Sequence, residues 1–118
     1  MKKILVIEDN PVNSCLIESV LNKKGCTIIQ TSHADTGIKL AAKESPMLII
    51  IDLHIADVNG LEAVRKINLL VPQIPLIALI SHAMTNEKEK ALNAGCTACI
   101  EKPIDPSTLA EQLECYLS

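Results

Sequence analysis

The chain has 118 residues, of which 48% are hydrophobic, and its formal net charge at pH 7 is −3. This length suits a single hydrophobic core, so we expect residues 1–118 to form one domain. Tyr116 is the sole aromatic residue, so the core is predicted to be aliphatic. The absence of a Lys/Arg cluster argues against contact with nucleic acid. No apolar run approaches the ~18 residues of a membrane span and no signal-peptide pattern precedes residue 3, so we expect no membrane contact and a cytoplasmic location.

Aliphatic segments that suit strands alternate along the chain with segments whose apolar residues recur at helical spacing. The first strand is predicted over residues 2–8. Asn10-Pro11 then supplies the cap and first-turn proline of a helix that ends at Gly25. A shorter and more polar strand over residues 26–31 is expected near a sheet edge, and a helix follows over residues 34–44.

The segment that organises the rest of the chain is residues 47–60. Its residues 48–51 form an uninterrupted aliphatic run that ends at the carboxylate of Asp52. A run that is apolar on both faces is typical of the central strand of a parallel sheet covered by helices. A turn at Val58-Asn59-Gly60 then leads into a third helix that reaches Val71 and ends before Pro72.

The second half of the chain continues the alternation. Strands are predicted over residues 75–80 and 97–101, separated by a charged helix that is capped by Thr85 or Asn86. The apolar face of this fourth helix is thin, so we expect it to be the most mobile helix and a docking surface for partners. Asp105-Pro106 begins the last helix. The inward-facing residues expected on the helices are Val12, Leu16, Ile17, Val20, Leu21, Ile38, Ala41, Ala42, Leu61, Val64, Ile67 or Asn68, Val71, Ala91, Leu92, Leu109, Leu113 and Tyr116 or Leu117.

Five strands that alternate with five helices predict a doubly wound α/β fold with a five-stranded parallel sheet. We expect the flavodoxin-like strand order 2-1-3-4-5, which places the carboxyl ends of the first and third strands side by side. That order brings Glu8, Asp9 and Asp52 into one crevice, and Lys102 reaches it from the end of the fifth strand.

Three neighbouring carboxylates and one ammonium group suggest phosphoryl chemistry at this crevice. The carboxylates need a counter-charge, and their hard oxygen atoms suit Mg²⁺. An aspartate such as Asp52 can act as a nucleophile and form an aspartyl-phosphate. Lys102 would supply a point charge to the phosphate or to Asp52. The alternative is a solvated acidic rim with one weak surface salt bridge.

Several motifs accompany this crevice: Glu8-Asp9-Asn10, Asp52, Gly60, IALISHAM at 77–84, Ala94-Gly95 and Lys102-Pro103. Together they resemble a response-regulator receiver domain, of the stand-alone or hybrid-kinase type, over essentially the whole chain. The resemblance implies that Asp52 accepts a phosphoryl group from a histidine kinase or histidine phosphotransfer protein, and that Lys102 contacts the phosphate. It further implies that Asp9, Asp52 and the backbone carbonyl of His54 bind Mg²⁺, with Glu8 reaching the ion through water. The resemblance also implies a downstream protein bound on the face of the fourth helix, fifth strand and fifth helix. Because the transfer and hydrolysis would be slow and self-catalysed, we do not expect an enzyme.

The sequence departs from the family pattern at the residues that transmit the signal. Ile80 stands where the family has Thr or Ser, and Ser81 could supply the hydroxyl only if the strand bulges there. Cys99 stands where an aromatic switch residue is usual, and Ile55-Ala56 replaces Met-Pro. Two hypotheses therefore stay open: a phosphoacceptor with a non-standard switch, and a degenerate receiver that binds proteins whatever its phosphorylation state.

Two other groups of residues were weighed as sites. Cys96 and Cys99 have C-x-x-C spacing, but we expect them to enter a strand and point to opposite faces, as reduced thiols without a redox or zinc role. The histidines, His33, His54 and His82, are isolated and are read as loop residues. An independent phosphatase would need a second acid two residues after its nucleophile, where this chain has His54.

Overall fold

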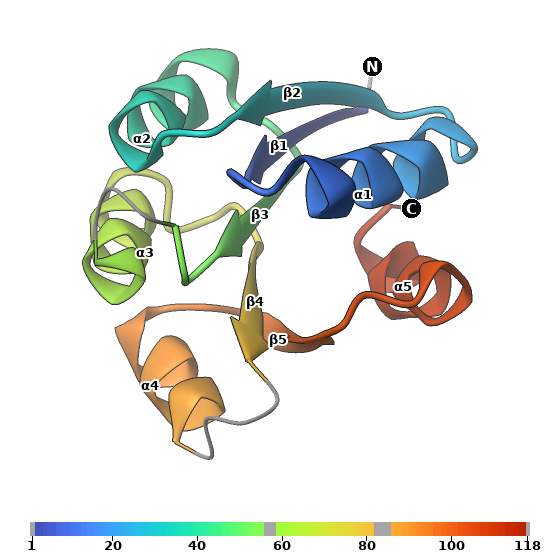
Figure 1. Ribbon diagram of the computed structural model, residues 1–118. Coiled ribbons are helices and arrows are strands. Elements are labelled where there is room, and N and C mark those ends of the chain that lie inside the picture. The colour runs from blue at the N-terminus through green and yellow to red at the C-terminus, as the bar shows by residue number, and fades with distance from the viewer. Residues whose placement is uncertain (1, 56–58, 82–85, 118) are drawn as a thin grey trace.

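The computed structural model describes residues 2–55, 59–81 and 86–117, and Figure 1 shows the arrangement of the elements. The predictions made for Ala56, Val58, His82 and Thr85 lie outside the described residues. The elements, in chain order, are β1 (Lys3–Ile7), α1 (Pro11–Asn22), β2 (Thr27–Thr31), α2 (Ala34–Glu44), β3 (Leu48–Asp52), α3 (Gly60–Leu70), β4 (Leu76–Ser81), α4 (Glu87–Ala94), β5 (Ala98–Lys102), α5 (Pro106–Leu113) and the 3₁₀ helix η1 (Glu114–Tyr116).

The five strands form one parallel sheet in the order β2-β1-β3-β4-β5. This is the predicted flavodoxin-like order, and the prediction is confirmed. The more polar strand β2 lies at one edge, as expected, but it is as long as β1 and β3 rather than shorter. All five residues of β3 are buried at the centre of the sheet.

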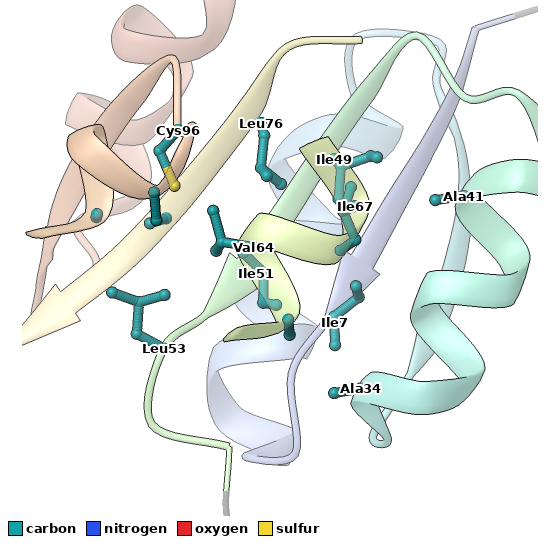
Figure 2. Packing of buried hydrophobic residues seen from close by; sticks show 14 of the residues in the cluster. Ile7, Ala34, Ala41, Ile49, Ile51, Leu53, Val64, Ile67, Leu76 and Cys96 are labelled. Carbon is teal, nitrogen blue, oxygen red and sulfur yellow. The ribbon is translucent and has the colours of Figure 1, made fainter. Parts of the chain in front are cut away.

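Helices cover both faces of the sheet, with α1 and α5 on one side and α2, α3 and α4 on the other (Figure 1). Successive residues of β3 alternate between the two apolar layers. Leu48 and Ile50 pack with α1 and α5, while Ile49 and Ile51 pack with α2, α3 and α4. Figure 2 shows the second layer, in which Ile49 lies beside Ile67 and Ile51 beside Val64 of α3. The continuous aliphatic run of β3 is therefore explained by burial on both faces.

Side-chain caps fix where the helices around the site begin. The Asn10 side-chain oxygen accepts hydrogen bonds from the amides of Val12 (2.9 Å) and Asn13 (3.3 Å) at the start of α1. Asn59 caps α3 and Asp105 caps α5 in the same way. Each cap satisfies amides that a helix start leaves without partners. The caps predicted from Asn10 and Asp105 are confirmed.

Some strands and helices end one or more residues away from the predicted position. Strands β4 and β5 each extend one residue further than expected, to Ser81 and Lys102, because these two residues pair in the sheet ladder. The last helix ends at Leu113 and tightens into η1.

Three residues expected to face the core are exposed instead. Val12 is 69% exposed, because it lies in the first turn of α1, before the residues that pack on the sheet. Leu92 is 40% exposed, since the buried positions of α4 are Ala91 and Ala94 and a neighbouring residue points about 100° away around the helix. Ala42 of α2 is turned to solvent for the same reason. None of the helices in the described residues has the length and apolarity needed to cross a membrane.

Candidate functional site

Two buried carboxylates lie side by side where β1 and β3 end. Ile7 of β1 pairs with Ile51 of β3, so Glu8 and Asp52 are the next residues in register. Glu8 is 1% exposed and Asp52 is 3% exposed. The Oε1 atom of Glu8 is buried and has no hydrogen-bond partner. An unsatisfied buried oxygen is costly, which marks it as an acceptor for a ligand.

Lys102, the last residue of β5, supplies the counter-charge. Its ammonium nitrogen lies 3.0 Å from Oδ1 and 3.1 Å from Oδ2 of Asp52. The backbone amide of His54 also donates to Oδ1 of Asp52, at 2.8 Å. Asp52 is therefore an oriented carboxylate with two donors, at the carboxyl edge of the sheet.

The two carboxyl groups respond in opposite directions to this environment. Burial, the hydrogen bond with Asp52 and the negative charge of Asp52 raise the pKa of Glu8 to about 7. Burial alone would raise the pKa of Asp52 as well, but hydrogen bonds with Glu8, the His54 amide and Lys102 outweigh it and lower that pKa below its usual range. Without a bound cation, Asp52 therefore ionises at a lower pH than Glu8.

The predicted third carboxylate occupies a more open position. Asp9 follows Glu8 directly, but its side chain is exposed. Within residues 2–55, 59–81 and 86–117, no three His, Cys, Asp or Glu side chains are already gathered as a metal-binding group. The donor chemistry nevertheless fits a hard cation, since the unpartnered Glu8 oxygen lies next to the Asp52 carboxylate.

Three residues that depart from the family pattern, Ile80, Ser81 and Cys99, lie on the neighbouring strands β4 and β5. Ile80 is 2% exposed and belongs to the apolar layer under α2, α3 and α4. Ser81 continues β4 in unbroken register opposite Lys102, so the bulge that its predicted substitute role requires is not present here, and that role stays a prediction. Cys99 lines a groove of about 310 Å³ with Ile80, Pro103 and other residues of β5 and α5.

The prediction that Cys96 and Cys99 point to opposite faces of the sheet is wrong. Cys96 lies before β5 rather than within it, so strand alternation does not apply between the two residues. Both Cys96 and Cys99 pack on the same apolar layer. Burial raises the pKa of Cys96 to about 12, and all five cysteines are free thiols. A protonated, buried thiol is a poor nucleophile, which agrees with a packing role.

One group of contacts near the site was missed by the sequence analysis. The Glu87 carboxylate, at the start of α4, lies 2.8 Å from Nε2 of His54 and accepts a hydrogen bond of 2.8 Å from the Ser81 amide. Glu87 stands in a run of alternating charges, which is typical of a solvated face. No signal in the sequence distinguishes it from Glu89.

Comparison with known proteins identifies the architecture. The family model described as the response regulator receiver domain matches residues 4–114. The chain belongs to this family. The polar-differentiation response regulator DivK of Brucella anthropi is 31% identical to it over 118 residues, covering 98% of this receiver domain and 96% of DivK.

Solved receiver domains share the fold. A CheY-like receiver domain protein from Methanospirillum hungatei superposes with a TM-score of 0.90 at 26% identity, covering 99% of this chain and 94% of that one. The receiver domain of the sensor histidine kinase PA1611 from Pseudomonas aeruginosa gives a TM-score of 0.87 at 27% identity, covering 98% and 97%. That second structure has a magnesium ion coordinated in its active-site cleft.

Proposed function

We propose that Asp52 accepts a phosphoryl group and that residues 1–118 act as one receiver domain in two-component signalling. The observation that supports this most is the geometry of Asp52, which is buried, ionised and bound by Lys102 and the His54 amide. A carboxylate oxygen of Asp52 forms the new oxygen–phosphorus bond while the phosphorus–nitrogen bond of the donor breaks. The nitrogen leaves with that electron pair and takes a proton from solvent. Lys102 neutralises charge on the transferred oxygens.

Magnesium would occupy the acidic pocket beside Asp52. Its ligands would be Asp9, Asp52 and the backbone carbonyl of His54, and Glu8 would reach it through water, using the oxygen that has no other partner. When bound, the ion would offset the charge of the transferring group. The PA1611 receiver domain, at 27% identity, has magnesium coordinated in its active-site cleft, which supports a magnesium site in this pocket.

The partners follow from family membership. The donor would be a histidine kinase or a histidine phosphotransfer protein, and a downstream protein would bind the α4–β5–α5 face. We expect the exchange to take place in the cytoplasm, without nucleic acid or membrane, and the domain to be no more than a self-catalysed acceptor.

A second candidate is a receiver that binds proteins independently of phosphorylation. The observation that favours it is the buried Ile80, whose side chain has no hydroxyl for a phosphate oxygen. The usual Thr/aromatic pair is replaced by Ile80 and Cys99. Phosphorylation at Asp52 would then have no conventional route to the α4–β5–α5 face.

Intact-mass measurement after incubation with magnesium and phosphoramidate distinguishes the two candidates. We expect the wild type to gain the mass of one phosphoryl group and Asp52→Ala to gain none. Asp35→Ala, which removes an exposed acid of α2, is the matched control and should be phosphorylated like the wild type. If no phosphoryl donor produces an adduct on the wild type, the acceptor function is wrong and the binding module is left.

A further inference from the structure

Glu87 joins three parts of the chain that meet at the carboxyl edge of the sheet. Its carboxylate lies 2.8 and 2.9 Å from Nε2 of His54, in the segment after β3. The same carboxylate accepts the Ser81 amide at 2.8 Å, at the end of β4. Because Glu87 is the first residue of α4, these contacts tie the start of that helix to both strand ends. We call His54, Ser81 and Glu87 the Glu87 bridge. The Glu87 side chain is 10% exposed and that of His54 is 42% exposed, so the bond with the Ser81 amide is better shielded from solvent than the contact with His54.

His54 connects the Glu87 bridge to the phosphoacceptor. Its backbone amide donates to Oδ1 of Asp52, while its imidazole contacts Glu87. A change in the position of Asp52 or in its ligands therefore acts on the backbone of His54, and the side chain of His54 contacts Glu87 of α4. No such connection passes through Ile80, which offers the site no polar atom from its side chain.

Among the described residues, helix α4 packs on α3, β4 and β5 through a narrow apolar face. Its buried side chains are those of Ala91 and Ala94, which contribute little apolar area. Asn86, at its N-cap, makes no side-chain hydrogen bond to the helix. The Glu87 bridge is therefore a large part of what positions the N-terminal turn of α4.

We propose that Glu87 is a positioning residue that couples the phosphorylation state of Asp52 to α4, in place of the missing Thr and aromatic pair. This inference rests on the proposed phosphoryl acceptance. Phosphorylation adds negatively charged oxygens that compete with Oδ1 for the His54 amide and for Lys102. The backbone at His54 shifts, its imidazole leaves Glu87, and the first turn of α4 is released.

Hydrogen exchange measured by mass spectrometry on phosphorylated and unphosphorylated protein tests the coupling. Wild type, Glu87→Ala and Glu87→Gln are compared, and Glu89→Ala is the matched control because it removes an exposed carboxylate from the same helix. The intact mass of each sample reports phosphorylation separately. In the wild type and in Glu89→Ala, we expect phosphorylation to speed exchange of the α4 amides by roughly threefold or more.

In Glu87→Ala, we expect fast α4 exchange before phosphorylation and no further increase after it, although Asp52 is still phosphorylated. Glu87→Gln keeps an oxygen that accepts from His54 and Ser81, and should restore most of the wild-type response. An equal response in Glu87→Ala and wild type, or no response in a phosphorylated wild type, would overturn the coupling. A wild type that gains no phosphoryl mass refutes the acceptor function itself, and the coupling with it.

Discussion

Glu8 is a buried acid with one unsatisfied oxygen beside a second, ionised acid. Its pKa of about 7 lies above the ordinary value of 4.5, so the folded protein binds more protons than the unfolded chain between these values. The free energy of unfolding must therefore fall as the pH rises through that window, and stay lower above it. This cost is consistent with a pocket that is completed by a cation.

Glu8→Gln should accordingly stabilise the protein in the absence of divalent cations. Gln mimics the protonated acid, so it removes the cost of ionising a buried group. We expect the free energy of unfolding to rise by about 2 kcal/mol at pH 8 and by little at pH 4.5. Urea denaturation in EDTA at both pH values measures it. Glu18→Gln, on the half-buried surface of α1, serves as the control. Equal effects of Glu8→Gln at both pH values would contradict the raised pKa.

At the residue scale, the sequence predicts the groups that lie at strand ends and misses those defined by side-chain conformation. Glu8, Asp52 and Lys102 follow aliphatic strands directly, so topology alone brings them together. Glu87 and His54 approach each other across two loops, and only coordinates reveal that contact.

The start of α3 depends on a close approach of two backbone segments. A Cβ atom on Gly60 would collide with the backbone of Leu53, just after the phosphoacceptor strand. Backbone atoms cannot rotate away as a side chain can. The position therefore accepts only glycine without displacement of α3 or of the segment that carries His54.

Gly60→Ala should lower the free energy of unfolding by about 2 kcal/mol or more, although alanine normally favours a helix. Gly25→Ala is a useful comparison, because Gly25 has a positive φ of 78° but open space around its Cβ position. We expect about 1 kcal/mol there, from backbone strain alone. Thermal or urea unfolding of both variants decides the matter. A Gly60→Ala variant as stable as Gly25→Ala would show that the segment adapts without cost.

Elements with clear end signals are predicted well from this sequence. Helix α2 has the predicted bounds of 34–44, and α1 begins after the predicted Asn10 cap. The ends of β4 and β5 are harder to predict. Their last residues, Ser81 and Lys102, are polar and belong to the strands because they pair with each other. The exposure of Leu92 is also hard to predict from the sequence. The small residues Ala91 and Ala94 form the buried face of α4, and the larger leucine side chain points outward.

At the scale of the whole molecule, the strand order follows from few physical rules. The alternation of elements requires parallel strands, and right-handed crossovers then restrict the order. β3, with all five residues buried, must lie inside the sheet. The fold was therefore predictable, and so was the edge that carries the site. The strand order does not predict whether magnesium binds all three acids, since Asp9 lies beyond the end of β1 and its side chain is exposed.

Magnesium should stabilise the entire fold if it binds at this edge, because the unfolded chain has no preformed site. A ligand at 100 times its dissociation constant adds ~2.7 kcal/mol to the free energy of unfolding. We expect a concentration-dependent rise in melting temperature for the wild type and for Asp35→Asn. Asp9→Asn should lose most of this rise, since a neutral amide is a weaker ligand for a hard cation. Calorimetric scans over a magnesium series provide the measurement. If Asp9→Asn responds like the wild type, Asp9 is not a ligand, and only Asp52 and the His54 carbonyl are left as direct protein ligands, with Glu8 reaching the ion through water.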